Sequence, residues 1–163
     1  DMPSTCPTCG WRLDFQAHNP KYKLRSTKRD ISATYDGQLI VSKQFRDFCQ
    51  QEGINGARFL PFINDENHFH LVVDRIVPFV VSEQSPKFYK YCSTCKIYGD
   101  IILASKVYIS TTVPLLDGFY RTDLVFASGN EKHPLVLVGT DTKSKLKAVG
   151  LKGLEFEPAF GIE

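Results

Sequence analysis

The chain has 163 residues, of which 42% are hydrophobic and 23% charged, and its formal net charge is +2. These values are typical of a folded globular protein and exclude a disordered chain. No apolar run approaches the roughly 20 residues of a membrane span, and the near balance of charge disfavours nucleic acid as a partner. We expect one domain over residues 1–163 that has no membrane partner.

The N-terminal part of the chain leads from a cysteine motif into a hairpin. Residues 1–29 contain that motif, followed by a polar stretch. Residues 30–35 and 38–41 are predicted to be strands, because Asp36-Gly37 between them favours a tight turn.

A helix is predicted directly after this hairpin. Ser42 can cap it, and Gly53 is a natural end. Phe45, Phe48 and Cys49 have the spacing of one helical face, so we expect that face to be buried. Cys49 is then most simply a small hydrophobic core residue.

The remainder of the chain is rich in predicted strands. These strands are predicted at 57–63, 69–81, 88–91, 107–110, 119–127, 134–138 and 153–158. Residues 64–67 are predicted to be a loop, and Pro78 is expected to bend or end the strand at 69–81. Thr140 or Thr142 can cap a short helix that ends at Gly150. Because strands outnumber helices and do not alternate with them, we expect an α+β fold with a mainly antiparallel sheet and two or three short helices.

Two cysteine pairs carry the clearest chemical signal. Cys6 and Cys9 enclose Pro7-Thr8, and Cys92 and Cys95 enclose Ser93-Thr94. Two residues between thiols allow one tight turn to direct both sulfurs at a single ion, and four thiolates match the tetrahedral preference of Zn²⁺. We therefore predict a structural zinc site, built as a zinc-ribbon-like pair of knuckles from Cys6, Cys9, Cys92 and Cys95.

Other interpretations of the cysteines fit less well. A disulfide scaffold conflicts with an odd number of cysteines, five. A thioredoxin-like pair follows a strand and opens a helix, whereas only five residues precede Cys6. A zinc deaminase needs a His-x-Glu sequence, which the chain lacks.

The knuckles also predict how the domain is organised. Residues 1–29 with 86–99 are expected to form a zinc-knuckle lobe, and 30–85 with 100–163 the α+β body. The zinc would then join the N-terminal segment to the middle of the domain. Unpaired thiols suit a reducing compartment, so a cytoplasmic location is expected.

A basic cluster offers an alternative function. It comprises Lys21, Lys23, Arg25, Lys28 and Arg29, with Tyr22 as an aromatic side chain on which a base could stack. A zinc-ribbon module that binds nucleic acid or has a regulatory role would use this cluster. The simpler interpretation is a solvated linker.

Evidence for catalysis in the sequence is weak. His68 and His70 share a strand face, and a hydrolase could use them with Asp74, but polar residues facing solvent are the simpler interpretation. Arg121 and Asp123 could bind an anion, although a structural salt bridge or a turn cap is the simpler role. Nucleotide-binding, nucleophile-elbow and zinc-protease motifs are absent from the sequence, so we expect no enzyme.

With these segments in place, the chain resembles the double-CxxCG family of bacterial proteins. The resemblance rests on Cys6-Pro-Thr-Cys-Gly10 and the second Cys-x-x-Cys, and it is supported by residues 38–42, 59–62, 120–126 and 146–158. The second motif departs from the family pattern, because Cys95 is followed by Lys96 rather than glycine.

The resemblance implies a function in immunity to polymorphic toxins. A member of this group would bind a cognate toxin domain in the producing cell and neutralise it by stoichiometric inhibition. Only the four cysteines carry over from the family as site residues. The toxin-binding residues are expected on a surface rather than in a pocket.

Overall fold

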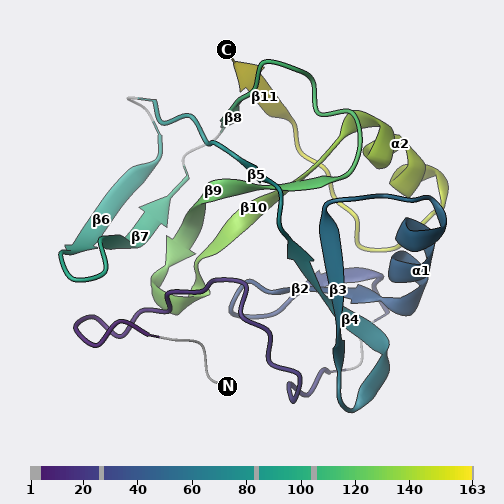
Figure 1. Ribbon diagram of the computed structural model, residues 1–163, viewed down its shortest axis with the longest axis horizontal. Coiled ribbons are helices and arrows are strands. Elements are labelled where there is room, and N and C mark those ends of the chain that lie inside the picture. The colour runs from purple at the N-terminus through teal and green to yellow at the C-terminus, as the bar shows by residue number, and fades with distance from the viewer. Residues whose placement is uncertain (1–4, 26–27, 83–84, 104–105, 163) are drawn as a thin grey trace.

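The computed structural model describes residues 5–25, 28–82, 85–103 and 106–162 (Figure 1). One antiparallel sheet has the order β1-β2-β4-β3, formed by β1 (Ile31–Ala33), β2 (Leu39–Ser42), β4 (Asp65–Val73) and β3 (Ala57–Phe62). A second sheet has the antiparallel order β10-β9-β7-β6, formed by β10 (His133–Val138), β9 (Phe119–Ser128), β7 (Ile97–Ile102) and β6 (Lys87–Cys92).

Three strands and the helices complete the described fold. Strand β5 (Ile76–Val77) runs parallel to β9, and β8 (Val107–Ser110) pairs in parallel with β11 (Ala159–Ile162). The α-helices are α1 (Lys43–Gln51) and α2 (Thr140–Ala148), and a 3₁₀ turn, η1, covers Gly129–Glu131. Both α-helices lie on one side of the molecule, opposite the β6–β7 hairpin (Figure 1). The predicted α+β class, with mostly antiparallel sheets and short helices, is confirmed.

The first hairpin and α1 form as their sequence signals predict. Gly37 has a φ of 78°, which the turn between β1 and β2 requires and which glycine adopts without strain. The Ser42 hydroxyl accepts a hydrogen bond from the Phe45 amide at 3.1 Å, so Ser42 is the N-cap. Phe45 and Cys49 are fully buried, as the helical spacing predicts.

The hydrophobic core has two parts. The larger lies between the first sheet, the two α-helices and β9, and includes Val41, Phe45, Phe119 and Leu146. The smaller lies in the second sheet around Phe79, Ile101 and Phe126. Because β9 contributes to both, it connects the two halves of the fold (Figure 1).

Several predicted boundaries are wrong. Residues 64–67 are not a loop, because β4 already begins at Asp65 in a tight hairpin with β3. The predicted strand 69–81 is interrupted at Asp74, which leaves the ladder and forms an ion pair with Arg58 at 2.6 Å. Strand β7 was not expected, since Gly99 and Asp100 in its centre have low strand propensity.

The C-terminal expectations also need correction. The N-cap of α2 is Gly139, whereas the Thr142 hydroxyl, one turn into the helix, donates to the Asp117 carboxylate at 2.8 Å. Residues 153–158 form no strand. Their apolar side chains Leu154 and Phe156 pack on the core, and the strand begins only after Pro158.

Candidate metal centre

The two cysteine motifs lie in two separate turns with similar backbone geometry. The first precedes β1, and its Gly10 amide donates to the Cys6 carbonyl at 2.8 Å. The second is the turn between β6 and β7, where the Lys96 amide donates to the Cys92 carbonyl at the same distance, 2.8 Å. Gly10 has a φ of 74° and Lys96 a φ of 59°. Lys96 therefore adopts the left-handed conformation that glycine supplies in the first turn, at a cost of about 1 kcal/mol.

The structure brings the four predicted cysteines together. Their Sγ atoms all lie within 4.8 Å of one another. The Sγ atoms of Cys6 and Cys92 are 4.0 Å apart, and those of Cys9 and Cys95 are 3.7 Å apart. A tetrahedral ion with metal–sulfur bonds of about 2.3 Å places its sulfurs roughly 3.8 Å apart. These four thiols could therefore hold a metal ion.

The two turns also resemble each other in the pKa values of their thiols. Amide groups of Cys9 and Thr8 donate to the Cys6 sulfur and lower its pKa, and those of Cys95 and Thr94 lower the pKa of Cys92 to about 6. Burial raises the pKa of Cys9 to about 12 and also raises the pKa of Cys95. The backbone amides of each turn thus favour the thiolate of one cysteine, the form that binds metal.

A buried lysine is electrostatically coupled to this cluster. Lys132, just after η1, is 0% exposed, and its ammonium group donates to the Tyr98 carbonyl in β7. The ammonium lies 4.9 Å from the centre of the Trp11 ring. Burial lowers the pKa of Lys132, while Asp100 and the thiols of Cys95 and Cys9 act in the opposite direction. The interior next to the cysteines therefore contains a lysine whose charged form these anionic groups favour.

Trp11 also fixes the first turn against the second sheet. A Cβ atom added to Gly99 in β7 would overlap the Trp11 ring, so the two are in close contact. The Cys6 amide donates to the Trp11 carbonyl at 2.8 Å. Glycine at position 99 thus allows the N-terminal segment to approach the strand that follows the second cysteine pair.

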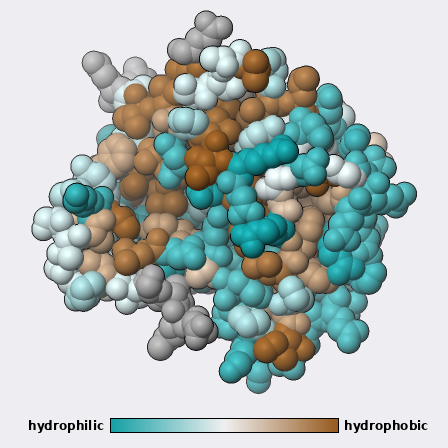
Figure 2. Space-filling model, in the orientation of Figure 1, coloured by the Kyte–Doolittle hydropathy of each residue, from teal (hydrophilic) through white to brown (hydrophobic). Residues whose placement is uncertain are grey.

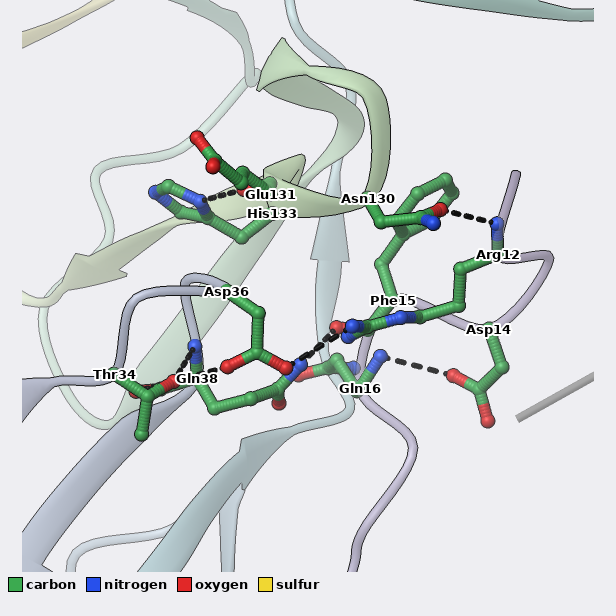
Figure 3. A network of polar contacts seen from close by, with 10 residues as sticks. All are labelled: Arg12, Asp14, Phe15, Gln16, Thr34, Asp36, Gln38, Asn130, Glu131 and His133. Atoms are coloured by element: carbon green, nitrogen blue, oxygen red, sulfur yellow. Dashed lines mark hydrogen bonds and ion pairs between the residues drawn. The ribbon is translucent and has the colours of Figure 1, made fainter. Parts of the chain in front are cut away.

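A polar network attaches the next part of the N-terminal segment to the β1–β2 turn and to η1 (Figure 3). Arg12 forms an ion pair with Asp36 in the β1–β2 turn at 3.0 Å, and its amide donates to the Asn130 side chain at 2.8 Å. The Gln38 side chain donates to the Phe15 carbonyl at 3.0 Å. The segment that contains the first cysteine pair is therefore held by side chains as well as by its thiols.

The candidate catalytic residues do not form one site. His68 contacts the Asp65 carboxylate at 3.0 Å, and Asp74 pairs with Arg58. His70 was expected to face solvent, but it is 3% exposed, because the N-terminal segment covers this face of β4 and places His18 against it. The Nδ1 atoms of His18 and His70 are 3.3 Å apart.

The other polar candidates have structural contacts. Asp123 accepts hydrogen bonds from the Phe79 and Leu124 amides at 2.7 and 2.9 Å, and Arg121 donates to the Val73 carbonyl at 3.0 Å. The basic side chains of the 21–29 segment are exposed, while residues 26 and 27 lie outside the described part of the chain.

Sequence reasoning missed Trp11, His18 and Lys132. Each acts through a contact with a distant part of the chain, and none has a local spacing pattern. The only signal for Trp11 was its place directly after the Cys-x-x-Cys-Gly turn.

Comparison with known proteins gives no match to any family model, curated protein or solved structure. No helix among the described residues is long and apolar enough to cross a membrane.

Proposed function

We propose that the protein is an immunity protein that binds a cognate bacterial toxin domain, and that a structural Zn²⁺ ion at Cys6, Cys9, Cys92 and Cys95 maintains its shape. The observation that carries the zinc assignment is the convergence of four thiols from two distant segments, with Sγ distances of 3.7 and 4.0 Å. Four protein ligands fill a tetrahedral zinc ion and leave no position for a substrate, which favours a structural role.

The hairpin next to the metal centre offers a surface for a partner. Tyr89 and Tyr91 in β6 are 50% and 55% exposed, and β6 is the edge strand of its sheet. Hydrophobic side chains also reach the surface over the neighbouring part of the molecule (Figure 2). Exposed tyrosines are frequent anchors in protein interfaces, and an edge strand can accept a strand from a partner.

The charges on this hairpin indicate the character of the partner surface. Lys87, Lys90 and Lys96 are all exposed, and of these Lys90 forms an ion pair with Asp100 at 2.8 Å. A toxin domain that docks here would present acidic side chains around an apolar centre. The resemblance to the double-CxxCG family supports a toxin as the occupant, and the tyrosines supply its anchors.

Co-expression tests this function. The full chain is expressed together with the polypeptide encoded by the neighbouring gene, and growth and complex formation are measured. We expect the chain to restore growth and to form a 1:1 complex. Tyr89→Ala combined with Tyr91→Ala should weaken binding about tenfold or more, because aromatic anchors dominate interface energies. Tyr35→Ala is the matched control, since Tyr35 is 89% exposed and lies in the β1–β2 turn, outside the β6–β7 hairpin.

Two outcomes would count against the proposal. If the neighbouring polypeptide is neither toxic nor bound by the chain, the hypothesis that a toxin is the partner is excluded. Salt-dependent binding of a labelled single-stranded oligonucleotide, weakened when Lys21, Lys23 and Lys28 are neutralised, would instead establish the nucleic-acid module.

A further inference from the structure

A cavity of about 390 Å³ lies between the β1–β2 hairpin and β10. Its inner wall is apolar and rich in aromatic rings, with Phe45, Phe119, Phe156 and Leu146 among the lining residues. Its volume falls within the range of roughly 300–1,000 Å³ that is usual for small-molecule sites. The cavity has no residue in common with the four-cysteine cluster or with the β6–β7 surface.

One buried residue in the wall, His70, has a ring nitrogen that makes no hydrogen bond within the described ranges. His18 Nε2 lies 2.9 Å from the Pro61 carbonyl, which can only accept, so His18 carries its proton on Nε2. His18 Nδ1 is then an acceptor in the neutral ring, and His70 Nδ1 must donate to it across 3.3 Å. His70 Nε2 is left with a lone pair, and no hydrogen bond to this atom is found within the described ranges. Because every fully buried side-chain nitrogen and oxygen in those ranges has a partner, His70 Nε2 retains some accessible surface.

His70 is suited to remain an acceptor. The residue is 3% exposed and lines the cavity. Burial and the neighbouring His18 lower the pKa of His70 to about 4, so its ring is neutral at neutral pH. A neutral imidazole in an apolar wall favours a ligand that donates one hydrogen bond, because an unpaired acceptor in such a site loses free energy.

The two amide side chains in the cavity lining, Gln16 and Gln38, already have partners. The Gln16 amide forms hydrogen bonds with both backbone groups of Val73, and the Gln38 amide donates to Phe15 (Figure 3). Neither amide needs a ligand group. Arg29, Ser32, His133 and Glu155 also line the cavity, but of its polar lining residues only His70 is buried, so His70 sets the polar requirement of the inner part.

We propose that this cavity binds a small aromatic molecule with a single hydroxyl or N–H donor, such as a phenol or an indole, whose donor bonds to His70 Nε2. The aromatic lining contacts the rings of such a ligand, and the one acceptor fixes its orientation. This binding site is independent of the proposed toxin and of the zinc ion.

The test uses the full chain, with 1-naphthol as the probe and 1-methoxynaphthalene as the matched compound without a donor. Calorimetric titration measures both affinities. We expect 1-naphthol to bind about tenfold more tightly than its methyl ether, the difference made by one hydrogen bond in a buried site. His70→Phe should abolish this preference, because it keeps a ring in the wall but removes the acceptor. His68→Phe on the same strand is the control and should retain the preference.

A second variant tests whether the two compounds bind in this cavity. Val136→Phe places a larger side chain in the cavity wall and should weaken the binding of both compounds. Equal affinity of the wild-type chain for the two compounds would overturn the proposal, and so would the absence of 1-naphthol binding at millimolar concentration. Both results come from the wild-type chain, so they do not depend on the folding of any variant.

Discussion

Lys132 places an ammonium group in the protein interior, where it is stabilised by the Tyr98 carbonyl and the Trp11 ring. A zinc ion with four thiolates has a formal charge of 2−, so a nearby buried cation offsets part of that charge. The same cation would be difficult to maintain without anions beside it, because burial disfavours the charged form. Lys132 and the occupied metal centre are therefore expected to stabilise each other.

The variant Lys132→Met tests this coupling. Methionine preserves most of the side-chain volume and removes the charge, so metal affinity should fall about 10–100-fold, the usual effect of losing an outer-shell partner. Competition with a chelator measures the change. Lys90→Met is the control, because Lys90 is exposed and paired with Asp100. Equal zinc affinities in the two variants would show that Lys132 does not act on the centre.

His70 makes stability depend on pH. Its pKa is lowered by burial to about 4 in the folded chain, against about 6.5 when unfolded, so the unfolded state binds the proton first as the pH falls. The contribution of His70 is complete above pH 6.5 and is lost between about pH 6.5 and 4, with an upper limit of roughly 3 kcal/mol.

Chemical denaturation of the wild type and His70→Phe over this pH range measures the effect. The wild type should lose more stability than the variant on acidification, because the variant lacks this proton-binding site. Parallel stability curves for the two proteins would be inconsistent with a neutral, buried His70.

Sequence spacing predicted the four cysteines but not the residues around them. Two thiols separated by two residues constitute a local geometric signal, and two such pairs predict a cluster that could hold a metal ion. The burial of His70 depends on His18, 52 positions away in the sequence, and the environment of Lys132 depends on Trp11 and Tyr98. No local pattern encodes these contacts, which is why His70 was expected to face solvent.

Among the elements, α1 shows how one polar residue connects several segments. The Ser42 hydroxyl caps the helix through the Phe45 amide and donates to the Asp30 carboxylate at 2.7 Å. The other oxygen of Asp30 accepts a hydrogen bond from the Lys152 amide at 2.8 Å. The start of α1 is thereby linked to the start of β1 and to the C-terminal segment.

We expect Ser42→Ala to lower the free energy of unfolding by about 1–2 kcal/mol, since it removes the cap and leaves Asp30 without this donor. Urea denaturation measures the change. Ser144→Ala in α2 is the control, because the Ser144 hydroxyl is exposed and bonds only to the Thr140 carbonyl of its own helix. A loss no larger than that of the control would mean that the cap does not stabilise the fold.

Elements with a strong local signal were predicted well, and those defined by distant pairing were not. The Asp36-Gly37 turn and the Ser42 cap specify the first hairpin and α1 through neighbouring residues alone. By contrast, β7 contains Gly99 because Trp11 packs there, and glycine weakened the strand pattern. Strand β11 forms by parallel pairing with β8, some 50 residues earlier in the sequence. The alternation of Leu154 and Phe156, which suggested a strand at 153–158, gives no information about that pairing.

At the scale of the whole molecule, the metal centre links parts of the chain that are far apart in sequence. Each thiol pair that bridges the two turns, Cys6 with Cys92 and Cys9 with Cys95, is separated by 86 positions. A metal that closes so long a loop stabilises the folded state, because its binding free energy is available only when both turns are in place. The toxin-binding surface proposed on β6 begins at one of these turns and would depend on the ion for its shape.

The most direct test is the metal content of the purified full chain, measured together with its melting temperature in the wild type, Cys92→Ser and Cys49→Ala. Cys49 is buried in the core away from the cluster, so Cys49→Ala controls for the loss of a buried thiol. We predict one zinc ion per chain in the wild type and Cys49→Ala, and in Cys92→Ser a loss of zinc with a lower melting temperature. A metal-free wild-type protein whose melting temperature does not change when zinc is added would contradict the account.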